Sequence, residues 1–296
     1  MSCVIRDSSL KKSICSCTLQ CSFWRGALNM ISVLNWALQA KLGLCCQTFF
    51  CQHWSGGLFR FVVGRHIVSG LSDGTVWIWD TKTGDQMVEL QGHDQAVCSI
   101  TYSLNGGCIV SGSKDRTVWI WDAETGNSVL ELWEPNNWVT SVTFSLDSTH
   151  TTSGSCDGTA QIWDAETGSP FREALQGHND LVLSIVFSPD GMHIISGSSD
   201  RTVHIWDAET GRLVGKPLWG HNFDGVKSVV FSPDGICILS GSYDGTVWIW
   251  DAETGSPFRE PLWGHTGLVA FVALSPDTVY PPPNDTPPPF DTLLTS

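Results

Sequence analysis

Short apolar runs alternate with polar turn residues through most of the chain. In one copy of the pattern, the apolar run Val182–Phe187 is followed at residues 188–191 by Ser-Pro-Asp-Gly. Pro presets φ in such a turn and Gly takes the left-handed position. We expect the three further strands of this copy at residues 193–197, 203–206 and 213–218. Four short strands with turn residues between them predict an all-β unit.

The unit occurs five times, and each copy ends in Ile-Trp-Asp. The tryptophans of these endings, spaced by 42, 42, 43 and 44 residues, are Trp79, Trp121, Trp163, Trp206 and Trp250. This period indicates stacked β-units, because a unit of this size cannot bury its own apolar face. We expect the repeat over residues 61–276. Residues 1–60 are a Cys-rich segment without the repeat, and residues 277–296 are a Pro-rich tail that we expect to be disordered.

A set of His, Ser, Asp and Trp recurs at matching places in the units. The three complete sets are His93, Ser111, Asp115 and Trp121; His178, Ser196, Asp200 and Trp206; and His221, Ser240, Asp244 and Trp250. The third unit has Ser, Asp and Trp but no His. A His, Ser and Asp set invites comparison with a catalytic triad, but a catalytic site is rarely repeated in every unit. We interpret the sets as structural, because buried polar groups must satisfy one another.

The Gly-His pairs, the Asp between the second and third strands and the final Trp-Asp resemble the WD-repeat family. The resemblance covers about residues 65–276. It implies an all-β propeller with five recognisable four-stranded blades, in a closed or incomplete ring. It also implies a non-enzymatic scaffold that binds a partner protein or peptide on one face. The form Trp-Asp-Ala-Glu-Thr-Gly is similar to WD arrays that follow NACHT domains in fungal proteins, so the alternative is the ligand-sensing part of a larger nucleotide-dependent switch protein.

The two ends of the repeat complement each other. The first unit has Ser69, Asp73 and Trp79 but no His at the matching place, whereas His265 and the apolar residues 268–274 precede no second strand. We expect residues 268–274 to supply the first strand of the first unit and His265 to complete its set. A local first strand at residues 58–63 is the alternative, and WD rings more often have seven blades.

Eight further residues are candidates for binding a partner. Trp133, Trp219 and Trp263 stand before the blade-connecting loops where other copies have Gln, and Arg116 and Arg201 replace Gly in the turn after the second strand. Trp77, Trp119 and Trp248 lie two positions before the repeat tryptophans. This last group either packs between blades or forms a partly exposed aromatic stripe. For the arginines, simple solvation is the alternative.

Net charge and the placement of cysteines bear on the class of partner and on the cellular compartment. A net charge of −14 disfavours nucleic acid and anionic membranes as partners. Eleven cysteines, seven of them before residue 60, give no disulfide framework, so we expect a reducing compartment, the cytoplasm or the nucleus. The cysteine groups at residues 15–21 and 45–51 lack the paired spacing of a zinc site. We therefore expect no metal, no cofactor and no small-molecule ligand.

Overall fold

The computed structural model describes residues 48–50, 58–61, 66–133, 137–221 and 224–274. Regular structure in these residues consists of antiparallel strands in five sheets. Blade one contains β1 (Thr48–Phe50), β2 (Leu58–Phe61), β3 (His66–Gly70), β4 (Val76–Asp80) and β5 (Gln86–Leu90). Blade two contains β6 (Val97–Tyr102), β7 (Cys108–Ser113), β8 (Thr117–Asp122) and β9 (Ser128–Trp133).

The other three sheets repeat this plan. Blade three contains β10 (Val139–Phe144), β11 (His150–Ser155), β12 (Thr159–Asp164) and β13 (Leu175–Gln176). Blade four contains β14 (Val182–Phe187), β15 (His193–Ser198), β16 (Thr202–Asp207) and β17 (Leu218–Trp219). Blade five contains β18 (Val226–Phe231), β19 (Cys237–Ser242) and β20 (Val247–Asp251), and a bridge from Val247 to Leu262 stands in for its fourth strand.

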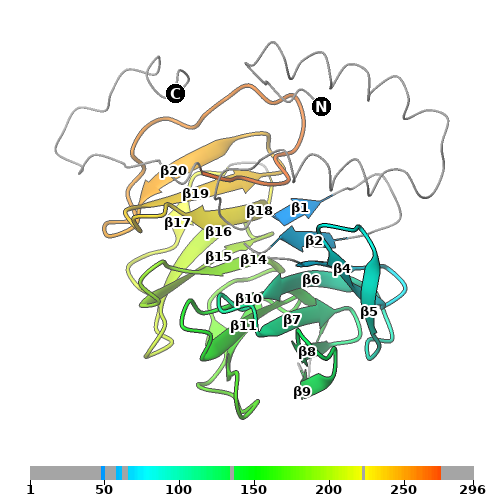
Figure 1. Cartoon of the computed structure of the whole chain (residues 1–296). Helices are drawn as coiled ribbons and strands as arrows, with labels where there is room; N and C mark the ends of the chain where they lie inside the picture. Colours follow the sequence, from blue (N-terminus) through cyan, green and yellow to red (C-terminus); the bar gives the residue numbers. More distant parts are fainter. Residues whose placement is uncertain (1–47, 51–57, 62–65, 134–136, 222–223, 275–296) are drawn as a thin grey trace, which may run out of the picture.

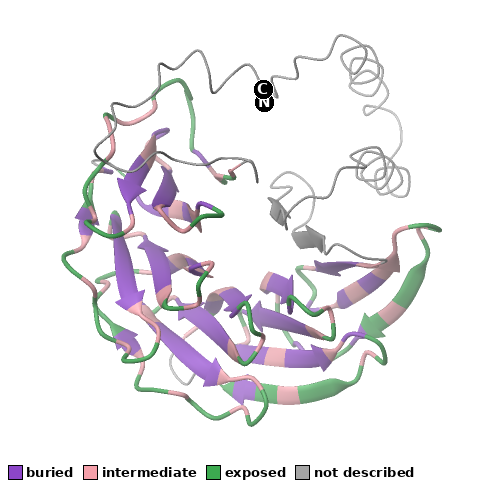
Figure 2. Ribbon diagram, turned by 60° about the vertical axis from the view of Figure 1, so that its left-hand side comes forward, coloured by how far each residue is buried: buried purple, intermediate pink, exposed green. Residues whose placement is uncertain are grey.

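The blades follow one another around an arc (Figures 1 and 2). Within the described residues, blade five does not meet blade one, so the ring is incomplete. This confirms the expected all-β fold of five repeated units. The same part of the chain contains no helix of the length and apolarity that crossing a bilayer requires.

The core lies between neighbouring blades. Apolar residues of one sheet pack on the first strand of the next, so that Val68, Val76 and Ile78 of blade one form one cluster with Val97 and Ile100 of blade two. All five side chains are 3% exposed or less. Burial of such surfaces is the main favourable term in folding, and each blade obtains it only from its neighbour.

The first strands of successive blades are also joined by a repeated hydrogen bond. In each case a serine in the third position of one first strand accepts a bond from a backbone N–H of the next. These bonds are Val142 N to Ser99 Oγ at 3.0 Å, Ile185 N to Ser141 Oγ at 3.2 Å, Val229 N to Ser184 Oγ at 3.2 Å and Val272 N to Ser228 Oγ at 3.3 Å. The ladder therefore fixes the alignment of the blades around the arc.

The expected closure of blade one by the C-terminal segment is wrong in this structure. The first-strand position beside β3 belongs to β2, where Phe59 pairs with Ser69. Residues 268–274 lie instead against blade five, where Val269 N donates to Ser242 O. They occupy the place of the first strand in a following blade. The local strand is favoured because pairing β2 with β3 closes a short loop at a small cost in chain entropy. Pairing the two ends of the repeat would close a loop of roughly 200 residues, which costs more.

The fourth strand of blade four is shorter than expected, and that of blade three is equally short. We expected residues 213–218 to form a strand, but only a bridge at Leu213 and the pair Leu218–Trp219 are in β structure. Pro217 cannot donate to the ladder, and Gly215 has a φ of 70°. In blades one and two, by contrast, the fourth strands contain no proline and are continuous.

Candidate functional site

The three complete polar sets form closed hydrogen-bond networks. In blade two, His93 Nδ1 lies 2.8 Å from Asp115 Oδ2, and His93 Nε2 lies 2.8 Å from Ser111 Oγ. Trp121 Nε1 donates to the same Ser111 Oγ at 2.9 Å. The network ties the loop before the blade to its second and third strands.

Blades four and five repeat this geometry. In blade four, the distances from the His to the Asp and to the Ser are 2.9 and 2.7 Å; in blade five they are 3.2 and 2.8 Å. The tryptophan donates to the serine at 2.8 Å in both. The residues that the structure brings together here are His178, Ser196, Asp200 and Trp206, and His221, Ser240, Asp244 and Trp250.

Each network also includes a threonine, which was not predicted from the sequence. Thr117 Oγ1 lies 3.0 Å from His93 Nδ1 and donates to Asp115 Oδ1, and Thr202 and Thr246 do the same in blades four and five. The pattern Asp-x-Thr recurs in all five units and could have revealed it. The threonine therefore helps to hold the carboxylate beside the histidine.

The networks hold their carboxylates ionised. Burial opposes the charge on Asp115, but hydrogen bonds from His93 and Thr117 outweigh it and lower the pKa to about 2. The pKa of Asp200 is likewise well below its usual range, since bonds from His178 and Thr202 overcome its burial. Burial lowers the pKa of His221. An ionised carboxylate beside a buried imidazole is a stable pair at neutral pH.

This geometry does not suit nucleophilic catalysis. Ser111 is 0% exposed, and its Oγ already accepts the indole N–H of Trp121. A nucleophilic serine needs an oxygen that can reach a substrate carbonyl. Ser111 is buried and its Oγ is held by two hydrogen bonds, so it cannot reach a substrate. The sets are best explained as structural.

The sets of blades one and three keep the bond from tryptophan to serine. In blade one, Trp79 Nε1 donates to Ser69 Oγ at 2.9 Å, while Asp73 bonds Thr75. In blade three, the corresponding bond from tryptophan to serine is 2.8 Å long. His265, expected to complete blade one, is exposed, and its carbonyl faces Gly245 of blade five.

Exposed aromatic side chains gather at the end of the blades that carries the networks. Trp133 pairs with Thr117, and Trp219 pairs with Thr202. These two threonines directly follow Arg116 and Arg201 of the turns after the second strands. Trp133, Trp219 and Trp263 are 58%, 64% and 74% exposed. Large apolar side chains left in water at matching positions of several blades are typical of contact surfaces. We call this end, with its turns between the second and third strands, the network face.

Both arginines of the network face hold a strained backbone. Arg116 and Arg201 have φ of 73°, where the other blades place glycine at Gly74, Gly158 and Gly245. A non-glycine residue in this region costs about 1–3 kcal/mol. Lys114, two residues before Arg116, lies 4.9 Å from the ring centre of Trp138.

The third group of tryptophans packs inside the blades. Trp77, Trp119 and Trp248 are half-buried, and Trp119 and Trp248 stack on the repeat tryptophans with centroids 5.0 and 5.1 Å apart. Trp119 also lies against the core between blades one and two. Of the two interpretations, the geometry favours packing over an exposed stripe.

The comparisons with known proteins agree with this geometry. The model of the family described as "WD domain, G-beta repeat" matches residues 45–80, 84–122, 126–164, 168–207 and 211–251. The first match begins upstream of the boundary expected at residue 61. A search of curated proteins found no match to the chain.

Proposed function

Because the chain belongs to the WD-repeat family, we propose that it is a scaffold that binds a partner protein or peptide on the network face. Repeats of this family generally serve protein–protein interaction and typically carry out no catalysis. The observation that supports a site on this face is the exposure of Trp133, Trp219 and Trp263 at equivalent positions. Tryptophan is enriched among the residues that dominate binding energy.

The strained arginines support the same face. Glycine would relieve the strain at Arg116 and Arg201, as it does in the other blades. Backbone strain of this kind is found preferentially at functional sites. Arginine can donate five hydrogen bonds to a partner's carboxylates and backbone carbonyls.

The opposite face differs in chemistry. There the turns after the third strands of blades two to five have the sequence Asp-Ala-Glu-Thr-Gly, and the aspartates accept backbone N–H groups within their own turns. Their glutamates Glu124, Glu166 and Glu209 are exposed. This face repels anionic partners, and it offers a control surface for the network face.

Affinity capture with paired variants tests the proposal. Trp219→Gln and Trp263→Gln place on the network face the residue that blades one and three have in Gln91 and Gln176, so the fold should tolerate both. The matched control Glu209→Gln changes the opposite face. We expect proteins captured by the wild type to be lost from the tryptophan variants, by quantitative mass spectrometry, and retained by the control. Equal retention by all variants would refute a site on the network face.

Location in the cytoplasm or nucleus is part of the proposal. The free cysteines Cys98, Cys108, Cys156 and Cys237 support a reducing compartment, because thiols persist there.

A further inference from the structure

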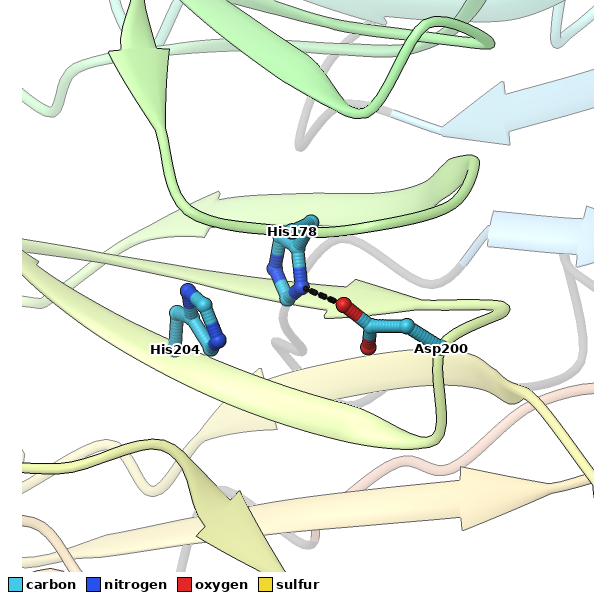
Figure 3. A group of neighbouring side chains, drawn as sticks. All are labelled: His178, Asp200 and His204. Carbon is cyan, nitrogen blue, oxygen red and sulfur yellow. Dashed lines mark hydrogen bonds and ion pairs between the residues drawn. The ribbon is translucent and has the colours of Figure 1, made fainter.

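Blade four has a histidine at a buried strand position where the other four blades have tryptophan or glutamine. His204 occupies the position that holds Trp119 in blade two and Trp248 in blade five. Its imidazole stacks on that of His178, with centroids 3.8 Å apart and an angle of 19° between the planes. Figure 3 shows the two imidazoles side by side and the Asp200 carboxylate bonded to His178.

The three side chains bring a donor set of two nitrogens and one oxygen together in a buried place. The ligand atoms of His178, Asp200 and His204 all lie within 4.8 Å of one another. The side chains of His178 and Asp200 are 1% and 9% exposed, and His204 is 2% exposed. Two imidazoles and a carboxylate form a set that zinc and similar ions bind in proteins.

One donor of the set is left without a partner. His204 Nδ1 is buried and makes no hydrogen bond. A buried polar atom in this condition costs free energy that a ligand would recover. The equivalent polar groups in blades two and three are satisfied, since Trp119 Nε1 donates to Thr117 Oγ1 and Gln161 Nε2 donates to two backbone carbonyls. Trp248 Nε1 in blade five is unpartnered too, but an indole N–H cannot ligate a metal.

We propose that His178, His204 and Asp200 form a site for a divalent transition-metal ion of the zinc type. An imidazole is smaller than the indole at the same position in blades two and five. In this proposal, the difference in volume accommodates the ion and a water molecule as its fourth ligand once the His204 ring has moved. Zinc sites with three protein ligands commonly hold such a water.

The site is not preformed. Ligands of a tetrahedral zinc ion with bonds of roughly 2.0–2.1 Å lie roughly 3.3 Å apart, and stacked rings point their lone pairs along nearly parallel planes. His204 must therefore rotate out of the stack. Rotation breaks no hydrogen bond at Nδ1, but it gives up the contact with His178. We expect binding to be weaker than in a rigid structural zinc site for this reason.

The network can accept the ion without releasing a proton. With His178 Nδ1 donating to Asp200, the Ser196 hydroxyl donates to His178 Nε2 across 2.7 Å. An ion bound at Nδ1 replaces that proton, which moves to Nε2 and is donated to Ser196 Oγ. Ser196 then orients the ligand, as hydrogen-bonded partners of metal-bound histidines do.

The substitution His204→Trp gives a matched test, because it installs the residue that blades one, two and five have at this position. The full-length protein, stripped of metal with a chelator, is titrated with Zn²⁺ by calorimetry and with Co²⁺ by absorption spectroscopy. Cysteines elsewhere bind either ion equally in both proteins, so the difference between them isolates the site. Co²⁺ at the site should give ligand-field bands without thiolate-to-cobalt charge transfer.

We expect wild-type protein to bind one more Zn²⁺ than His204→Trp, and its melting temperature to rise with Zn²⁺ concentration until the site is saturated. His204→Phe serves as a second variant if the indole does not fit, with circular dichroism reporting the fold. Identical isotherms and melting curves for the wild type and a folded variant would overturn the proposal. They would show that His204 is only a packing partner of His178.

Discussion

Removing the serine of a complete set should destabilise the protein more than removing the serine of an incomplete one. Ser240 Oγ holds two buried groups, Trp250 Nε1 at 2.8 Å and His221 Nε2 at 2.8 Å. Ser69 Oγ holds Trp79 Nε1 at 2.9 Å, and Trp79 is half-buried whereas Trp250 is 1% exposed. The variants Ser240→Ala and Ser69→Ala therefore remove the same hydroxyl but leave different numbers of buried groups without a hydrogen-bond partner.

The expected magnitudes follow from these bonds. A buried donor or acceptor without a partner costs about 1–3 kcal/mol. Ser240→Ala leaves two such groups and should therefore lower the free energy of unfolding by about 2–6 kcal/mol. Ser69→Ala leaves one group that water can reach, which gives about 1 kcal/mol. The same hydroxyl is removed in both, so the difference between the variants reports the histidine bond together with the deeper burial of Trp250.

Urea unfolding followed by tryptophan fluorescence and by circular dichroism measures both values. The slope against urea should be unchanged, because neither variant alters the surface exposed on unfolding. Hydrogen exchange in β19 and β20 provides a second, local measurement for Ser240→Ala. Equal losses of stability in the two variants would refute the view that His, Ser, Asp and Trp act as one network.

Three further outcomes are expected. Gly112→Ala puts a Cβ 2.5 Å from Val139 Cγ1 and should cost about 1–3 kcal/mol in urea unfolding by overpacking, whereas Gly107→Ala, with its nearest atom 3.4 Å away, should change stability by less than about 0.5 kcal/mol. Arg116→Gly should raise the free energy of unfolding by up to about 1 kcal/mol and weaken partner binding, because φ of 73° favours glycine; loss of stability would contradict the strain. The folded-state pKa of Asp115 is lowered to about 2, so the stability that its ionised carboxylate contributes is complete above about pH 4 and is lost as the pH falls toward 2. The free energy of unfolding, measured from pH 5 to 2, should therefore fall less steeply in Asp115→Asn than in the wild type. Equal pH dependence in the two proteins would contradict the lowered pKa.

The repeated parts of the structure were predictable because they depend on short-range geometry. The third strands and the His, Ser, Asp and Trp positions lie at offsets set by tight turns, and antiparallel pairing then fixes the register, as in the pair Ile109 with Trp121. The threonine of each network was equally visible in Asp-x-Thr, but it was overlooked. The prediction of the fourth strand was wrong where a proline removes a hydrogen-bond donor from the strand ladder, as Pro217 does.

Closure of the ring could not be predicted in the same way. Whether residues 268–274 reach blade one depends on the rotation between successive blades, and small rotations accumulate around the arc. No single repeat determines that sum. The stack of His178 on His204 was missed for a related reason, since its two members come from a loop and a strand whose distance is set by tertiary packing.

Comparison of the five copies separates positions that hold the fold from positions that are free to bind. The serine of the network is the same in every copy and is buried in each, as Ser111 and Ser240 illustrate. The residue before each blade-connecting loop is Gln in two copies and Trp in three, and it is exposed in either form, as Gln176 and Trp219 show. A change at the first kind of position alters stability, and a change in stability lowers the amount of protein able to bind. Partner binding is therefore assigned to the network face only if the tryptophan variants lose the partner while their unfolding curves stay those of the wild type.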